Sequence, residues 1–229
     1  MGAARRATAV LSSLALKGVL EKLRGPFERS SGPLELRFDA TQALLPLVRA
    51  GEKADLLILT SEAIDELHAG AAVTRRWVLG SSGVGIAVRS GAPKPDIGSV
   101  EALTDALVSA RSVAHSRVGA SGLYFSGLIE RLGIAQRLKK RIVVEKGPVG
   151  RVVAAGEAEL GVQQLCELAP VPGIDIVGPL PAPLQKLTSF SAAIPAAAAH
   201  PEGALALIEL LRSDTGRTAM LDGGLQPAG

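Results

Sequence analysis

The sequence predicts an α/β fold built around a parallel sheet, and three observations lead to this prediction. Short apolar runs alternate with longer segments in which apolar residues recur at helical spacing. This alternation repeats three times before residue 70, and strands joined by crossover helices lie parallel in one sheet. With 229 residues, of which 47% are hydrophobic, the chain can bury the core that such a sheet needs. Ligands of this fold class bind beyond the carboxyl ends of the strands.

The first part of the chain contains three strand–helix pairs. The apolar runs at 7–13, 34–38 and 54–60 predict strands, and the segments 14–29, 41–50 and 61–67 predict the helices that follow them. The first helix has one apolar face, made by Leu16, Val19, Leu20, Leu23 and Phe27. Gly51 is expected to end the second helix, and Ser61 is expected to cap the third.

A second block begins near residue 75, where two apolar runs flank the sequence GSSG at 80–83. Further strands are predicted at 112–116, 140–146, 159–165 and 187–195, and helices after the loop at 93–99, after residue 119, at 149–155 and near the end of the chain. We interpret the middle block as a second β/α unit inserted into the first. The predicted lobes are therefore 1–80 with 187–229, and 81–186, joined by two crossings.

Composition excludes several classes of partner and cofactor. The net charge is +3, but aromatic residues make up only 3% of the chain, whereas single-stranded nucleic acids need stacking rings beside the cations. We therefore expect no nucleic-acid partner, and the mild basic excess suits a small anionic ligand. The single cysteine, Cys166, cannot form a disulfide within the chain. The spacing of the three histidines matches no zinc-binding pattern, so we expect neither metal nor cofactor.

The first twenty residues have two arginines ahead of an apolar run, as a secretory signal does. However, Lys17 interrupts the run, and no small-residue cleavage site follows. We therefore expect a first strand and helix here, and a cytoplasmic protein as the sequence stands. Removal of a signal peptide from a longer precursor would make it periplasmic. No stretch has the length and apolarity for membrane insertion.

One short segment, SRVGASGLYF at 116–125, places glycine and serine where a helix begins. The start of a helix carries unpaired N–H groups and partial positive charge, so small residues there let an anion approach the amides. Two interpretations are open for Ser121: it only caps the helix, or it belongs to an anion site.

Four segments together resemble the molybdate-binding family of type II periplasmic binding proteins. They are AGEKADLLILTS (50–61), VGASGLY (118–124), AAGEAELGVQQ (154–164), and SFSAAIP followed by the helical end of the chain. The resemblance implies a two-lobed α/β periplasmic-binding-protein type II fold, with an interlobe cleft that closes over a small oxyanion. It also implies a solute-binding protein that passes its ligand to an ABC transporter permease.

In that family, neutral hydroxyls and backbone amides from several loops hold the anion. The resemblance places the corresponding loops at 12–15, 39–41 and 120–122. The ligand-binding candidates are Ser12, Ser13, Thr41, Ser61, Ser121, Gly122, Gln163 and Gln164. Gln164 stands where the family has a tyrosine. Because glutamine both donates and accepts hydrogen bonds, the pair at 163–164 suits a carboxylate or hydroxy acid better than a symmetrical oxyanion.

The alternative to a transport receptor is a cytosolic enzyme on the same fold. His115 is the imidazole placed to act as general acid or base, and Arg117 could orient a carboxylate. With the Ser121 amide stabilising an enolate, these residues predict an isomerase or tautomerase of a small unsaturated carboxylic acid. A third class, the sensing half of a transcription regulator, is disfavoured because the chain begins with a strand and a core helix rather than a DNA-reading module.

Overall fold

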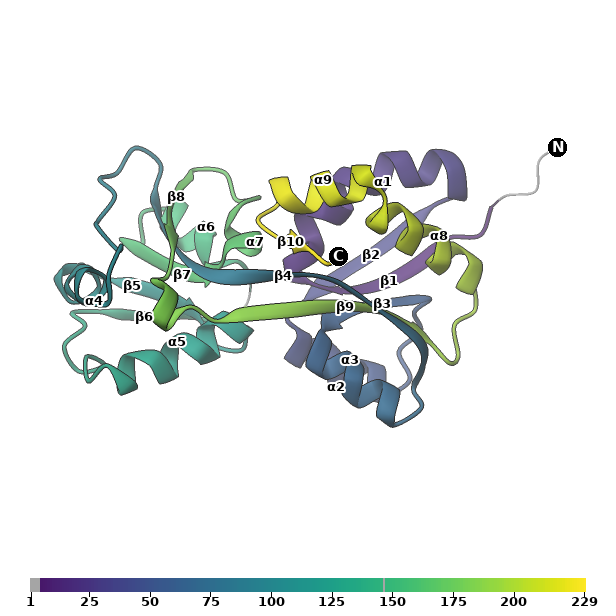
Figure 1. Ribbon diagram of the computed structural model, residues 1–229, viewed down its shortest axis with the longest axis horizontal. Coiled ribbons are helices and arrows are strands. Elements are labelled where there is room, and N and C mark those ends of the chain that lie inside the picture. Colours follow the sequence, from purple (N-terminus) through teal and green to yellow (C-terminus); the bar gives the residue numbers. More distant parts are fainter. Residues whose placement is uncertain (1–4, 146) are drawn as a thin grey trace. The chain divides into compact units, whose positions relative to one another are not determined.

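The computed structural model describes residues 5–145 and 147–229 and divides the chain into two compact units (Figure 1). Unit 1 consists of the chain up to Ser81 together with Thr188–Gly229, and unit 2 consists of Ser82–Leu187. The chain passes from one unit to the other twice, within strand β4 (Val73–Arg89) and within strand β9 (Leu187–Pro195). Residues 1–4, and Lys146 at the end of the predicted strand 140–146, lie outside the described residues.

The sheet of unit 1 contains three parallel strands, as the strand–helix alternation predicts. These strands are β1 (Thr8–Ser13), β2 (Leu34–Asp39) and β3 (Leu56–Thr60), and β1 pairs in parallel with both of the others. Strand β9 extends the sheet antiparallel to β3, which gives the order β2-β1-β3-β9. The carboxyl ends of β1, β2 and β3 therefore lie at one edge of the sheet.

Helices cover both faces of the unit 1 sheet, with α1, α8 and α9 on one face and α2 and α3 on the other (Figure 1). Their bounds are α1 (Lys17–Ser31), α2 (Thr41–Arg49), α3 (Ser61–Ala69), α8 (Pro201–Arg212) and α9 (Asp214–Asp222). A 3-10 turn, η1 (Leu14–Leu16), precedes α1, so the α-helix predicted from residue 14 begins at Lys17. The residues of the predicted apolar face are all buried.

The sheet of unit 2 is mixed. Strands β5 (Val113–Ser116), β6 (Arg141–Val144) and β7 (Leu160–Gln164) are parallel, with β5 in the middle. Strand β4 pairs antiparallel with β7 and with β8 (Ile174–Pro179). The helices are α4 (Val100–Ser109), α5 (Ala120–Arg131), α6 (Val149–Ala154) and α7 (Leu165–Leu168), with a 3-10 turn η2 (Ala182–Leu184).

The two faces of the unit 2 sheet bury different clusters. Phe125, Leu128 and Ile129 of α5 pack with residues of α4 and with Val113 and Val162 of the sheet. On the other face, α6 packs with Ala114 of β5 through a cluster made by Val149, Val153 and Ala158. Because side chains alternate along a strand, this division shows which face each polar residue at the strand ends occupies.

Several local predictions were wrong in detail. The two apolar runs around GSSG form one continuous strand, β4, and neither β8 nor α7 was predicted. The glycine at position 80 permits pairing with β10 (Gln226–Pro227), because a Cβ there would lie 2.4 Å from the Gln226 carbonyl oxygen. Among the described residues, no helix is both long enough and apolar enough to cross a membrane.

Candidate functional site

The carboxyl edge of the unit 2 sheet brings together most of the predicted site residues. Strands β5, β6 and β7 end at this edge because they are parallel, and α5, α6 and α7 begin just beyond it. The predicted residues on these strand ends and helix starts are His115, Arg117, Ser121, Gly122, Gln163 and Gln164. A ligand that contacts them would lie where open α/β sheets bind their ligands.

The start of α5 lies against the end of β5. Gly119 occupies the N-cap position, and its amide donates to the Ser116 hydroxyl over 3.0 Å. Ser121 is the second helical residue and is buried, so the interpretation of Ser121 as the N-cap was wrong. A Cβ on Gly122 would lie 1.9 Å from the Ser116 carbonyl oxygen, so only glycine fits there. This contact fixes the first amides of α5, which have no partners within the helix, at the end of the strand.

Gln163 connects the starts of α6 and α7. Its side-chain oxygen accepts a hydrogen bond from the Val149 amide over 2.8 Å, and its Nε2 donates to the Glu167 carboxylate. Glu167 is half-buried, and burial raises its pKa to about 7, although the bond from Gln163 opposes this shift. The sequence analysis did not single out Glu167. The available signal was a lone acid in the apolar segment LCEL directly after a strand.

Gln164 and His115 lie on the α5 face of the sheet, opposite to Gln163. Both side chains are at least 98% buried. The Gln164 side-chain oxygen accepts a hydrogen bond from the Cys166 thiol, with 3.6 Å between oxygen and sulfur. The centre of the His115 ring lies 5.4 Å from the centre of the Phe125 ring. Nδ1 of His115 is 3.1 Å from the Ser116 carbonyl oxygen.

Burial next to Phe125 lowers the pKa of His115, and the positive charges of Arg141 and Arg117 lower it further. The bond to the Ser116 carbonyl opposes this shift. The imidazole is therefore neutral at pH 7, with Nδ1 assigned as the donor to that carbonyl and Nε2 left with a lone pair. Cys166 is buried as expected, and burial raises the pKa of its thiol so far that it is no nucleophile.

Arg117 extends into solvent and forms an ion pair with Glu145 over 2.5 Å. This pair raises the pKa of Arg117 and lowers that of Glu145. The predicted role of Arg117, to orient a ligand carboxylate, would require it to exchange this partner.

The predicted residues of unit 1 lie at the carboxyl edge of its own sheet. Ser13 ends β1, Thr41 begins α2 and Ser61 begins α3. The Thr41 hydroxyl accepts from the Thr60 amide over 3.3 Å, and the Ser61 hydroxyl lies 2.8 Å from that of Ser191. Thr60, not Ser61, holds the N-cap position of α3, so that prediction was wrong. The buried Ser12 hydroxyl donates to the Ser13 carbonyl over 3.0 Å.

Unpartnered buried polar atoms coincide with the predicted site. Among the described residues, buried side-chain atoms without a hydrogen-bond partner are Thr8 Oγ1, Ser13 Oγ, His115 Nε2 and Gln164 Nε2. Leaving such an atom unpaired costs about 1–3 kcal/mol, and each one therefore calls for an explanation. Apart from Thr8, these residues are ones that the sequence assigned to ligand binding or catalysis.

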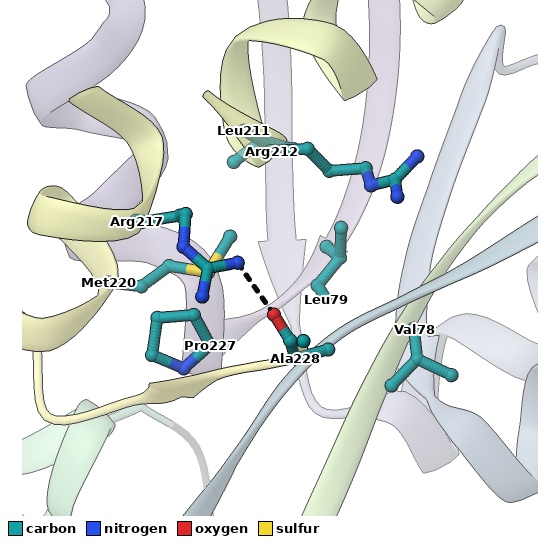
Figure 2. Close-up of a pocket in the computed structure, with 9 residues that line it drawn as sticks. Val78, Leu79, Leu211, Arg212, Arg217, Met220, Pro227 and Ala228 are labelled. Carbon is teal, nitrogen blue, oxygen red and sulfur yellow. Dashed lines mark hydrogen bonds between the residues drawn. The ribbon is translucent and has the colours of Figure 1, made fainter. Parts of the chain in front are cut away.

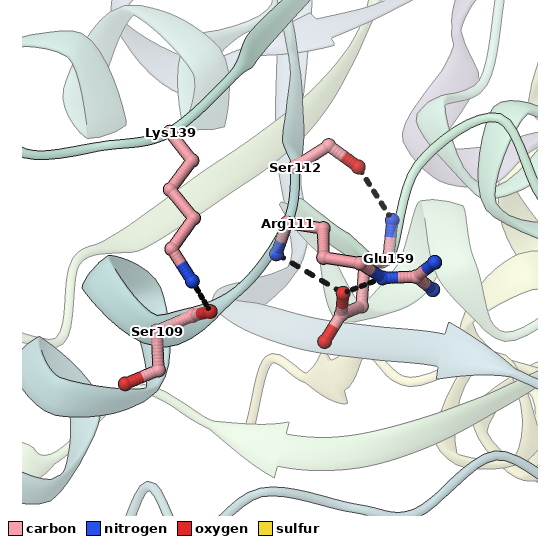
Figure 3. A network of polar contacts seen from close by, with 5 residues as sticks. All are labelled: Ser109, Arg111, Ser112, Lys139 and Glu159. Carbon is pink, nitrogen blue, oxygen red and sulfur yellow. Dashed lines mark hydrogen bonds and ion pairs between the residues drawn. The ribbon is translucent and has the colours of Figure 1, made fainter.

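Two other polar features lie apart from these residues. A pocket of about 160 Å³ in unit 1 is lined by α8, α9 and the C-terminal segment, where Arg217 donates to the Ala228 carbonyl over 2.7 Å (Figure 2). At the start of β5, Arg111 pairs with Glu159, whose amide donates to the Ser112 hydroxyl (Figure 3). This network is at the opposite end of β5 from His115, and it ties β5 to β7. None of the described residues form a cluster of three or more potential metal ligands.

A model of bacterial extracellular solute-binding proteins matches residues 8–226. The chain belongs to this family. Aconitate isomerase of a Pseudomonas species is 40% identical over 228 residues, which cover 95% of this chain and 87% of the relative.

Solved structures of low sequence identity confirm the predicted periplasmic-binding-protein fold. The periplasmic molybdate-binding protein of Azotobacter vinelandii superposes with a TM-score of 0.77 at 17% identity, over 97% of this chain and all of that one. The substrate-binding domain of a putative molybdenum ABC transporter from Clostridium difficile gives 0.71 at 15% identity, over 97% and 99% of the two chains. The chain, a member of the solute-binding family, therefore shares its fold with the molybdate-binding proteins that its sequence resembles.

Proposed function

We propose that the protein binds aconitate and catalyses its cis–trans isomerisation. The observation that carries this proposal is the 40% identity to an aconitate isomerase across 95% of the chain. It supports the enzyme alternative of the sequence analysis, an isomerase of a small unsaturated acid. It also agrees with the glutamines at 163–164, which suit carboxylates better than a symmetrical oxyanion.

The reaction needs only proton transfer. In aconitate, a carbon–carbon double bond lies next to a methylene group, and each of the three carbons bears a carboxylate. Removal of a methylene proton leaves an anion whose charge spreads over the allylic unit and the carboxylates. Return of a proton to the other terminal carbon moves the double bond, and the conformation at that moment decides between cis and trans. No oxidant, reductant or co-reactant is consumed.

The carboxyl edge of unit 2 contains groups suited to these tasks. The first amides of α5, around Ser121 and Gly122, are proposed to bind a carboxylate and to stabilise the charge that develops on it. The unpartnered Nε2 of Gln164 can donate to a second carboxylate, and the unpartnered Nε2 of His115 can accept a proton. At the carboxyl edge of the unit 1 sheet, we propose that the hydroxyl-bearing residues Ser12, Ser13, Thr41 and Ser61 bind ligand, and in unit 2 we propose the same for Gln163.

A second candidate function is that of a transport receptor for the same acid. Membership of the solute-binding family favours it, as do structural neighbours from ABC transporters. A receptor would pass the ligand to a permease without changing it. In either case, the family supports an extracytoplasmic location rather than the cytoplasmic one expected from the sequence.

Proton NMR of the purified protein with trans-aconitate separates the two functions, and calorimetry measures affinity in parallel. The isomerase is expected to convert trans-aconitate to cis-aconitate catalytically. A receptor would bind aconitate without forming product. If the folded protein neither binds nor converts aconitate, both functions for this acid are wrong, and binding of molybdate instead would support the oxyanion ligand that the family resemblance implies.

A further inference from the structure

We infer that the pocket of unit 1 shown in Figure 2 is a second ligand site, which binds a carboxylate attached to a small apolar group. The pocket is lined by residues of α8, α9, β4 and the C-terminal segment. None of the residues proposed to bind or isomerise aconitate lines it. The inference therefore goes beyond the proposed function and does not depend on it. All of the lining residues belong to unit 1, so the site lies within one unit.

Two guanidinium groups give the pocket its charge. Arg212 is the last residue of α8 and Arg217 lies in α9, and Figure 2 shows the two side chains extending from these helices. Both residues are exposed, and the described residues that line the pocket include no acidic side chain. Within the described part of the chain, neither arginine forms an ion pair. The pocket therefore holds two positive charges that no ion pair neutralises, and these charges favour an anionic ligand.

Both arginines have N–H groups available to such an anion. Arg212 makes no hydrogen bond with any other described residue. Arg217 donates from Nη1 to the Ala228 carbonyl over 2.7 Å, and its remaining N–H groups stay free. A guanidinium can donate two parallel hydrogen bonds to one carboxylate, which gives both affinity and a defined orientation. The charged end of the ligand is therefore expected at Arg212 and at the free N–H groups of Arg217.

The rest of the pocket wall is mainly apolar, which selects the other end of the ligand. Leu79, Leu211 and Met220 are at most 3% exposed, whereas Val78 is 57% exposed. The pocket volume, about 160 Å³, is close to the roughly 150 Å³ of an apolar protein cavity that binds benzene. A ring of that size would cover the exposed Val78 side chain, which removes apolar surface from water. Inorganic phosphate would satisfy the arginines but would give no such gain.

Hydrogen bonds fix the wall that the C-terminal segment contributes to the pocket. Strand β10 pairs with β4, and the Ala228 amide donates to the Leu79 carbonyl over 2.8 Å. The bond from Arg217 to the Ala228 carbonyl joins the same residue to α9. Arg217 therefore supports the pocket wall as well as lining it, whereas Arg212 supports no other described residue. Substitution of Arg212 consequently tests ligand binding with the smaller effect on the fold.

The test uses the full chain, with benzoate as the probe and calorimetry as the measure of affinity. We expect saturable binding of benzoate that Arg212→Gln weakens at least about tenfold, because the variant loses charge-assisted hydrogen bonds. Arg29→Gln is the matched control, since Arg29 is an exposed arginine of the same unit that does not line the pocket. It should leave the affinity unchanged. Benzamide, which has the ring without the charge, should bind at least about tenfold more weakly than benzoate.

Met220 reports directly on where benzoate binds. The chain has two methionines, and Met220 lines the pocket. In protein labelled with ¹³C at the methionine methyl groups, loss of one signal in Met220→Leu assigns that signal to Met220. We expect benzoate to shift this signal in a saturable way, with the same dissociation constant that calorimetry gives. Benzoate binding that leaves the Met220 signal unchanged would show that benzoate binds elsewhere, and the inference would be wrong.

A pair of variants at Val78 separates the effect of charge from that of fit. Aspartate and asparagine have nearly the same size, but only Val78→Asp adds a negative charge to the pocket. Because Val78 is exposed, both variants are expected to fold. The added carboxylate should pair with the arginines and repel benzoate, so V78D should bind benzoate at least about tenfold more weakly than V78N. Equal affinities of the two folded variants would contradict the assigned role of the arginines.

Propane-1,2,3-tricarboxylate, the saturated analogue of aconitate, distinguishes this pocket from the proposed isomerase site. Arg212→Gln should leave the affinity for this analogue unchanged, and Ser121→Pro should leave the affinity for benzoate unchanged. Weaker benzoate binding in S121P would show that benzoate occupies the aconitate site and would overturn the inference. Unchanged benzoate affinity in folded R212Q, phosphate binding as tight as that of benzoate, or no benzoate binding would also overturn it. If aconitate neither binds nor reacts while benzoate behaves as expected, only the proposed function is wrong.

Discussion

The side-chain amide of Gln163 donates a hydrogen bond to the carboxylate of Glu167 and so links the end of β7 to α7. Its other end accepts from the Val149 amide at the start of α6. One amide side chain therefore positions a carboxylate and satisfies a buried backbone donor at the same sheet edge. Gln163 therefore affects both the stability of the protein and the pKa of Glu167.

The substitution Gln163→Leu should change both properties. The variant leaves the Val149 amide unpaired, which costs about 1–3 kcal/mol of unfolding free energy. It also raises the pKa of Glu167, because the lost hydrogen bond stabilised the charged form. Urea unfolding and NMR titration of the glutamate carboxyl carbon measure the two effects. Gln136→Leu, on the exposed surface of unit 2, is the control and should change neither.

The substitution Ser121→Pro should weaken ligand binding at least about tenfold, which corresponds to about 1.4 kcal/mol. It removes one amide donor from the first turn of α5, a position where proline is compatible with the helix. The control is Glu101→Pro, the equivalent second residue of α4, which should leave affinity unchanged. Unchanged calorimetric affinity in a folded S121P protein would argue against an anion site at this helix start.

Gly122→Ala should destabilise the protein by about 1–3 kcal/mol. The new methyl group would lie 1.9 Å from the Ser116 carbonyl oxygen, so the start of α5 must move away from β5. Gly127→Ala in the same helix is the matched control. There the nearest atom is the flexible end of Arg131 at 3.3 Å, and the change should be neutral or stabilising by up to about 1 kcal/mol. Equal stabilities of the two variants would contradict the close contact.

His115→Gln should separate chemistry from binding. Because His115 is proposed to take the methylene proton, the variant should lose about 100-fold or more in kcat. Affinity for propane-1,2,3-tricarboxylate should change little, since the amides of α5 and the Gln164 side chain remain. Steady-state kinetics and calorimetry provide both values. A receptor without catalytic activity would show retained affinity and no turnover in wild type and variant alike.

Glu167 should also make stability depend on pH in a defined direction. Its folded pKa, about 7, lies above the ordinary value of 4.5, so the folded state holds the proton more tightly than the unfolded state. The stability that this group contributes is complete below pH 4.5 and decreases as pH rises through 7. The wild type should therefore lose stability relative to E167Q over this range in urea unfolding. If the difference in unfolding free energy between the wild type and E167Q did not change with pH, the Glu167 carboxyl group would have the same pKa in the folded and unfolded states.

The sequence alone predicted the elements that place the site. The strands ending at Ser13, Ser116 and Gln164 were expected within a residue or two, because short runs rich in apolar residues between longer helical segments indicate buried strands. Strand β8 was missed because the segment IDIVGP carries an aspartate and a glycine that weaken the strand pattern.

Features that depend on tertiary contacts could not be predicted. Ser121 was a candidate cap by residue type, but Gly119 takes that position because Gly122 packs on the Ser116 carbonyl. Glu167 stood out only when folding brought it beside Gln163 and away from water. The lone pair of His115 Nε2 likewise depends on its bond to the Ser116 carbonyl, which no sequence pattern records.

The approach to equilibrium from both isomers tests the central claim most directly. Two samples of the wild-type protein, one started with pure trans-aconitate and one with pure cis-aconitate, are followed by proton NMR. An isomerase brings both samples to the same final ratio at rates proportional to protein concentration. Binding of both isomers without any change in either spectrum would contradict the isomerase function.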